Sequence, residues 1–209
     1  MEAAPLEFQV SIAPEDRTRA DMYALLARLY LDAPDGALLC ALGAAGALQT
    51  EGERGEQLAQ AWRDLCLAAR AMDEDAARQE YQELFVGVGK SEVNLHASYY
   101  LAGFMMEKPL AEVRESLARL GLGRRSGSGP VEDHLAALCE TMRVLIAGAV
   151  GVLPQSVAVQ KSFFEQYVSP WHVRCCTAIV QTPIANFYRL VAQLTTIFMS
   201  LEAEAFTIE

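Results

Sequence analysis

Apolar residues recur along most of this chain at the spacing expected of helices packed on a core. The first such stripe has apolar residues at i, i+3, i+4, i+7 and i+8, namely Met22, Leu25, Leu26, Leu29 and Tyr30. Pro14 and the two acidic residues after it suit the first turn of a helix, because proline is tolerated there and carboxylates favour the positive end of the helix dipole. The pattern predicts a helix that begins near Pro14 and ends before the turn at residues 34–36.

The same spacing continues to the end of the chain, and no convincing alternation of apolar and polar residues indicates a strand. Further helices are expected over the ranges 36–48, 58–69, 73–85, 98–107, 109–120, 131–150, 156–168, 170–180 and 183–205. The sequence therefore predicts an all-α, bundle-like protein of about nine to ten helices.

Residues 81–100 interrupt this pattern and contain the first candidate site. A helical stripe runs to Phe85 and is broken by Gly87 and Gly89, after which a polar loop leads to a second apolar segment near Ser98. A break between two helical flanks places backbone and polar side chains at the surface of a helical body, where binding residues tend to lie.

The clearest linker is residues 120–130, LGLGRRSGSGP, whose glycines and serines do not favour a regular element. We expect a flexible leader at 1–13, a helical half at 14–119, this linker as a hinge loop, and a second helical half at 131–209. Such a hinge is compatible with a monomer or with a domain-swapped dimer.

Composition and charge narrow the class of partner. Hydrophobic residues make up 52% of the chain and charged residues 21%, as in a globular protein. The formal net charge of −10 makes nucleic acid and anionic membrane surfaces poor partners and favours a basic peptide or protein face.

The N-terminus lacks the pattern of a signal peptide and no apolar run is long enough to span a bilayer, so we expect a cytoplasmic protein without stable membrane insertion. No C-x-x-C pair is present, and buried free thiols are expected at Cys40, Cys66, Cys139, Cys175 and Cys176.

The run GVGKS at 87–91 resembles the end of a nucleotide-binding P-loop. The full pattern would need a glycine at position 84, which is Leu84, and a strand where this chain predicts a helix. We therefore expect an ordinary glycine-broken loop and no phosphate site.

Asp133 and His134 form the second candidate site, after Gly129-Pro130. The acidic residues there fall in the predicted first turn of a helix, where a carboxylate can cap free backbone amides. A histidine beside a carboxylate is also a common device for recognition or proton transfer, and the residues alone leave capping and recognition as equal alternatives. No serine or cysteine nucleophile in an elbow motif accompanies the pair, so we expect no enzymatic activity.

Metal binding is less well supported. A di-iron bundle places a glutamate three residues before a histidine, and none of the three histidines has one. We therefore expect no metal and no resident cofactor. The alternative from another class is a small helical metal-binding protein or enzyme that uses Asp133, His134 and Glu140.

The two candidate stretches resemble the TorD/DmsD family of redox-enzyme maturation chaperones. The family pattern of an aromatic residue, Leu-Phe-x-Gly-Pro and a later Ser-x-Tyr is matched at Tyr81, at residues 84–87 and at Ser98-Tyr99-Tyr100. The family's Pro-x-Asp-His signature is matched at residues 132–134. The resemblance extends over roughly residues 20 to 205 and includes the aromatic-rich closing helices. The chain departs from the family at Val88 and Val131, which replace family prolines, and at Tyr167, where the family often has a histidine.

The resemblance implies a cytoplasmic chaperone without enzymatic turnover. Such a protein binds the twin-arginine signal peptide and the apo form of a molybdopterin-containing oxidoreductase, assists cofactor insertion and delays export. The signal-peptide-binding residues carried over from the resemblance are Tyr81, Leu84, Phe85, Gly87, Ser98, Tyr100, Asp133 and His134. Leu84, Phe85 and Tyr100 would contribute to an apolar groove, and Asp133 with His134 would bind the polar or basic part of the peptide.

Overall fold

The computed structural model describes residues 12–87, 91–123 and 129–208. Its described residues form ten α-helices and two short π-helical segments, and contain no strand. The α-helices are α1 (Pro14–Leu31), α2 (Gly36–Ala44), α3 (Gly52–Ala71), α4 (Glu74–Tyr81), α5 (Ala97–Ala102), α6 (Lys108–Arg119), α7 (Leu135–Ala147), α8 (Val157–Phe163), α9 (His172–Gln181) and α10 (Phe187–Ile208). The π-helical segments, Gln82–Val86 and Phe164–Val168, extend α4 and α8. The predicted all-α class is confirmed.

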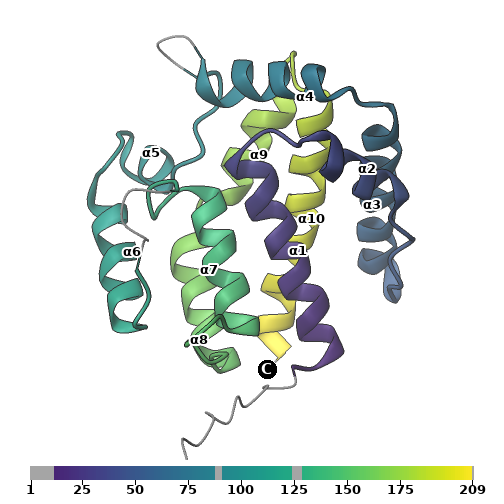
Figure 1. Cartoon of the computed structure of the whole chain (residues 1–209). Coiled ribbons are helices and arrows are strands. Elements are labelled where there is room, and N and C mark those ends of the chain that lie inside the picture. Colours follow the sequence, from purple (N-terminus) through teal and green to yellow (C-terminus); the bar gives the residue numbers. More distant parts are fainter. Residues whose placement is uncertain (1–11, 88–90, 124–128, 209) are drawn as a thin grey trace, which may run out of the picture.

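Helices from both ends of the chain share the centre of the molecule. In Figure 1, α1 lies along α7, α10 lies beside them, α2 and α3 cover one side, and α5 and α6 cover the other. A single buried cluster includes residues that precede and follow the linker, such as Leu26 on α1, Leu138 on α7 and Phe198 on α10. The helical halves on either side of the predicted hinge therefore contribute to one core.

Two buried carboxylates fix the ends of α10. Glu80 on α4 accepts hydrogen bonds from the backbone amides of Asn186, Phe187 and Tyr188 at 2.9, 3.1 and 2.8 Å, which caps the first turn. Near the other end, Glu202 makes a bidentate ion pair with Arg19 of α1, with N–O distances of 2.7 and 2.9 Å. Both contacts join segments that are far apart in the sequence.

Several predicted boundaries were wrong for identifiable reasons. Residues 98–107 do not form one helix, because α5 ends at Ala102 and Gly103 adopts the left-handed conformation with φ of 85°. Glu132 and Asp133 precede α7 instead of forming its first turn, because His134 is its N-cap. The ranges 170–180 and 183–205 begin late, at His172 and Phe187.

The cysteine prediction is correct in part. All five cysteines are free, and four of them are buried. Cys40 is exposed, because the buried side of α2 is made by Leu39, Leu42 and Gly43. None of the helices in the described ranges combines the length and the hydropathy that crossing a bilayer requires.

Candidate functional site

The two stretches that the sequence singles out meet in a short antiparallel pairing. Residues 95–98 lie beside residues 133–135, with Ala97 N donating to Asp133 O at 2.9 Å and Leu135 N donating to Leu95 O at 2.8 Å. We call this pairing the His96–His134 bridge. It joins the start of α5 to the start of α7 and so brings the two candidate sites together from opposite sides of the linker.

Asp133 is built into this bridge. Its side chain is 1% exposed, and its Oδ2 accepts a hydrogen bond of 2.9 Å from the backbone amide of Ser98 in the first turn of α5. Of the two alternatives that the sequence left open, the structure therefore shows capping, although of α5 and not of α7. A role of this carboxylate in ligand binding stays a prediction.

His134 caps the following helix through its ring. Nδ1 accepts a hydrogen bond of 3.1 Å from the backbone amide of Ala136, so this nitrogen carries no proton in the folded state. The ring meets His96 edge to face, with centroids 4.8 Å apart. Burial lowers the pKa of His134 to about 3, with a further contribution from His96, and burial also lowers the pKa of His96. Both rings are neutral near pH 7.

The predicted site residues between Tyr81 and Gly87 lie near the C-terminal end of α1. The Tyr81 hydroxyl donates to Leu31 O at 2.8 Å. Leu84 is fully buried, and the Phe85 ring packs edge to face against Tyr188 with centroids 4.9 Å apart. Gly87, with φ of 64°, ends the π-helical segment.

Ser98 and Tyr100 support α5. Ser98 is buried, whereas Tyr100 is half-buried, stacks on Trp171 at a centroid distance of 5.5 Å and donates its hydroxyl hydrogen bond to Asn94 O at 2.8 Å. Four of the eight predicted residues are buried, namely Tyr81, Leu84, Ser98 and Asp133, and Gly87 is half-buried. The side chains of Phe85, Tyr100 and His134 are partly exposed.

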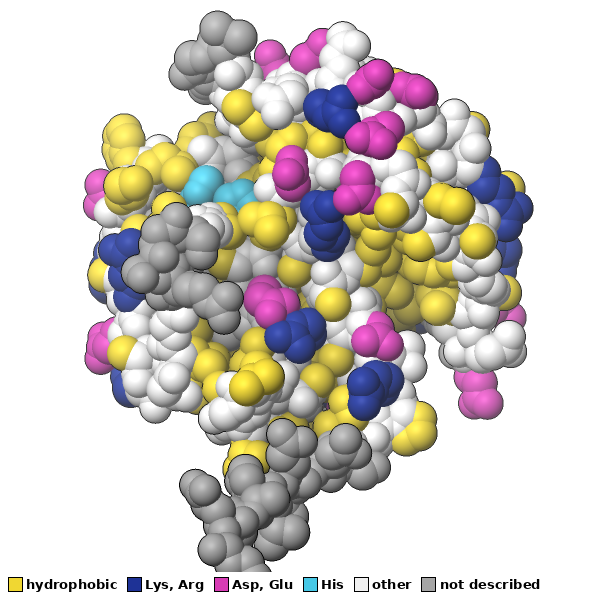
Figure 2. Space-filling model, in the orientation of Figure 1, with side chains coloured by type: hydrophobic (Ala, Val, Ile, Leu, Met, Phe, Trp, Pro, Cys, Tyr) yellow, Lys and Arg dark blue, Asp and Glu magenta, His cyan; other side chains and the backbone are white. Residues whose placement is uncertain are grey.

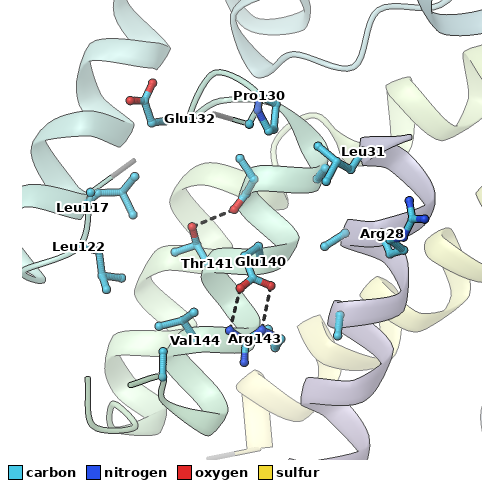
Figure 3. Close-up of a pocket in the computed structure, with 17 residues that line it drawn as sticks. Arg28, Leu31, Leu117, Leu122, Pro130, Glu132, Glu140, Thr141, Arg143 and Val144 are labelled. Atoms are coloured by element: carbon cyan, nitrogen blue, oxygen red, sulfur yellow. Dashed lines mark hydrogen bonds and ion pairs between the residues drawn. The ribbon is translucent and has the colours of Figure 1, made fainter. Parts of the chain in front are cut away.

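The main open cavity lies next to these residues and not among them. It has a volume of about 620 Å³ and lies between α1, α7 and the segments that flank the linker (Figure 3). We call it the α1–α7 groove. Its described lining residues are mostly small or aliphatic and are Ala24, Ala27, Arg28, Leu31, Leu117, Leu122, Gly123, Gly129, Pro130, Glu132, Ala136, Ala137, Glu140, Thr141, Arg143, Val144 and Ala149. None of the eight predicted residues lines it.

The predicted residues nevertheless hold the walls of the α1–α7 groove. Tyr81 binds the carbonyl of Leu31 at one wall, and His134 binds the amide of Ala136 at the other. Sequence reasoning missed the groove because its alanines look like ordinary core positions. The available signal was the presence of small residues on two helices, at Ala24 and Ala27 and at residues 136–137.

Charged side chains at the edges of the α1–α7 groove form ion pairs. Glu140 binds Arg143 through two hydrogen bonds of 2.7 and 2.8 Å, as Figure 3 shows, and Glu132 binds Arg114 at 2.9 Å. Arg28 pairs with Asp35 outside the groove at 2.9 Å. The Arg28–Asp35 pair is solvent-exposed and contributes on the order of 0–1 kcal/mol, whereas Glu132 and Arg143 are more buried than their partners.

The geometry gives little support to the alternative chemistries. Asp133 and His134 are used as caps and Glu140 is paired with Arg143, so the proposed metal ligands do not converge. Within the described ranges, no group of three or more histidine, cysteine and acidic residues is placed to hold a metal ion. Most of the P-loop-like run, residues 88–90, and the linker residues 124–128 lie outside the described residues, as does the departure at Val88.

Comparisons with known proteins agree with the fold. Residues 51–177 match the family described as the nitrate reductase delta subunit, and this range contains all eight predicted residues. The crystal structure of a candidate redox enzyme maturation protein from Archaeoglobus fulgidus has the same fold, with a TM-score of 0.56, 17% sequence identity, and coverage of 96% of this chain and 99% of that one. No curated protein matches this chain.

Proposed function

Because the chain belongs to the nitrate reductase delta subunit family of redox-enzyme maturation chaperones, the TorD/DmsD type, we propose that its client is a molybdenum-containing oxidoreductase. In this proposal it binds the twin-arginine signal peptide and the apoprotein in the cytoplasm, assists insertion of the molybdopterin cofactor and delays export until insertion is complete. It needs no catalytic turnover and no cofactor of its own, since its work is binding and release.

The α1–α7 groove is the observation that carries this proposal. Its α7 wall runs from Ala136 to Val144, which at ~1.5 Å per residue is about 12 Å, or two turns of a bound helix. Alanines on both walls leave room for a bound backbone to approach closely. An apolar segment of a signal peptide matches this lining, and peptides that bind grooves gain most of their affinity from such apolar anchors.

The acidic residues beside the groove suit the two arginines of such a peptide. Glu132 and Glu140 are among the lining residues, and each already binds a guanidinium in the unliganded protein. An incoming arginine replaces one guanidinium by another at these sites, and the net charge of −10 favours its approach. The bidentate geometry at Glu140 is one that arginine provides and lysine does not.

The eight residues implied by the family resemblance have two proposed roles. Phe85, Tyr100 and His134 contact the bound apoprotein at the edge of the groove. The interior residues keep its walls in place, as Tyr81 does for Leu31 and Asp133 does for the His96–His134 bridge.

Isothermal titration calorimetry with a synthetic twin-arginine signal peptide tests the proposal. Ala137→Trp fills the α1–α7 groove from a partly exposed position of α7 and should weaken binding at least about tenfold. Ala76→Trp, on the exposed face of α4, is the matched control and should bind as the wild-type protein does. A twin-lysine peptide should bind more weakly than the twin-arginine peptide.

The proposal fails if the wild-type protein does not bind the peptide. It also fails in its choice of site if Ala137→Trp and Ala76→Trp bind with the affinity of the wild-type protein.

A further inference from the structure

Exposed hydrophobic side chains gather on one short stretch outside the groove. Five large hydrophobic residues within 99–106 are well exposed, and Phe104 and Met106 are each 71% exposed. Figure 2 shows hydrophobic side chains gathered at the upper left, beside histidine side chains and over the region of α5 in Figure 1. We call this surface the α5 patch and define it by Tyr99, Leu101, Phe104, Met105 and Met106.

The backbone of the α5 patch holds these side chains outward at a cost. Met106 has φ of 59°, and no other non-glycine residue in the described ranges has a positive φ. A left-handed conformation is strained for a non-glycine residue, and here no burial of the side chain offsets the strain. Strain of this kind together with an exposed apolar side chain is more typical of a binding surface than of a structural turn.

The base beneath the α5 patch is tightly held. Tyr100 stacks on Trp171, and Asn94 Nδ2 contacts the sulfur of Met105 at 3.2 Å. The start of α5 is fixed by the hydrogen bond from Ser98 to Asp133. An apolar surface that is already ordered loses less conformational entropy when a partner binds, and its methionines can adapt to irregular partners.

Charge identifies the kind of partner. Residues 93–106 contain no charged residue, and exposed Glu92 and Glu107 flank them. A second copy of this chain would bring a net charge of −10 and the same two glutamates to the interface, which opposes self-association. An apolar segment next to basic residues meets no such repulsion.

We propose that the α5 patch is a second docking surface, which takes the later part of the signal peptide's apolar stretch, beyond the residues that bind in the groove. This inference rests on the proposed function. The two surfaces are connected by the His96–His134 bridge, because α5 begins directly after His96 and the groove residues Glu132 and Ala136 flank His134. A few residues of extended peptide, at ~3.3 Å each, therefore connect the two surfaces.

The test uses two synthetic peptides and two variants of the full chain. The long peptide carries the twin arginines, the residues that bind the groove and the whole apolar stretch, and the short peptide ends about six residues after the arginines. The patch variant combines Phe104→Ser with Met106→Ser. Leu67→Ser, at a well-exposed position of α3, is the matched control.

We expect the patch variant to bind the long peptide at least about tenfold more weakly than the wild-type protein, and to bind the short peptide with unchanged affinity. The control should match the wild-type protein with both peptides. Both substituted positions of the patch are solvent-exposed, so circular dichroism and the unfolding midpoint of the patch variant should also match the wild-type protein.

Each other outcome is decisive. Equal affinity of the patch variant and the wild-type protein for the long peptide overturns the inference and leaves the proposed function standing. Loss of affinity for both peptides assigns the effect to the groove and also overturns it. Binding of the wild-type protein, but not of the patch variant, to phosphatidylcholine vesicles without any effect on the long peptide shows a membrane-binding surface instead. Failure of the wild-type protein to bind either peptide refutes the proposed function and the inference together.

Discussion

The neutral, buried ring of His134 should make the protein less stable in mild acid, and His134→Asn should remove this sensitivity. Burial lowers the pKa of His134 to about 3, whereas a histidine in the unfolded chain titrates near 6.5. Above pH 6.5 neither state binds a proton at this ring, so its neutral form supports folding fully. As the pH falls below 6.5 the unfolded chain takes up a proton that the folded protein excludes, and stability is lost until the pH reaches about 3.

The size of the effect follows from these two pKa values. Between pH 6.5 and pH 5 the loss is about 1.4 kcal/mol per pH unit, which amounts to about 2 kcal/mol at pH 5. Asparagine is a good N-cap whose side-chain oxygen can accept the hydrogen bond from Ala136, and it does not titrate. The variant should therefore lose about 1 kcal/mol at pH 8, for lost packing against His96, but fall less steeply on acidification.

Urea unfolding followed by circular dichroism at pH 8, 7, 6 and 5, at constant ionic strength, measures the effect. The quantity of interest is the difference in unfolding free energy between pH 8 and pH 5, which should be about 2 kcal/mol smaller in His134→Asn than in the wild-type protein. His96 and His172, whose pKa values burial also lowers, act in both proteins and largely cancel in this comparison. Equal pH dependence in the two proteins, with unchanged m-values, would show that His134 is not held neutral as described.

Three further substitutions test the local structure. Glu80→Gln should reduce the unfolding free energy by about 1.5–3 kcal/mol, because it replaces a charged cap of three backbone amides by a neutral one, and a change below 0.5 kcal/mol would contradict that role. Gly87→Ala should cost about 1–3 kcal/mol in chemical denaturation, because φ of 64° with ψ of 170° is a conformation that alanine adopts poorly; an unchanged midpoint would refute this. Met106→Gly should leave thermal stability unchanged or raise it by up to about 1 kcal/mol, since glycine adopts φ of 59° without strain, and a clear destabilisation would show that the Met106 side chain supports the fold.

The all-α class followed from the spacing of apolar residues, because each helix buries one side against a shared core. The stripe from Met22 to Tyr30 lies within α1 as expected. Periodicity could not show that α4 and α8 continue as π-helical segments, since each segment is only five residues long, too short to reveal a period of its own. Nor could it show that α10 is capped from a residue more than 100 positions earlier, because Glu80 looks like an ordinary exposed helix residue in the sequence.

Residues 95–98 and 133–135, which belong to the two stretches singled out by motif order, are paired in the structure, but the exposure of the site residues was not predictable. The role of the eight residues in binding a client stays a prediction. The hydrogen bond from Ser98 to Asp133 spans 35 positions, so the burial of this carboxylate depends on a tertiary contact that no local pattern encodes. The apolar segment that begins near Ser98 was predicted as a helix over 98–107, and the structure instead ends α5 at Ala102 and leaves Phe104 and Met106 exposed to solvent.

Several residues of the family motif are buried, and the proposed binding surfaces are formed by other residues. This difference affects how substitutions in the family motif are interpreted. Asp133 and Leu84 are buried, so replacing either one removes a cap or core packing as well as any contact with a client. Lost peptide binding in such variants would follow from displaced groove walls as readily as from a lost contact. Ala137 in the α1–α7 groove is partly exposed and Phe104 in the α5 patch is well exposed, so substitution at these positions changes the binding surface with little effect on the core. Client recognition is therefore best mapped with positions such as Ala137 and Phe104, and the motif residues are better understood as the structure that presents them.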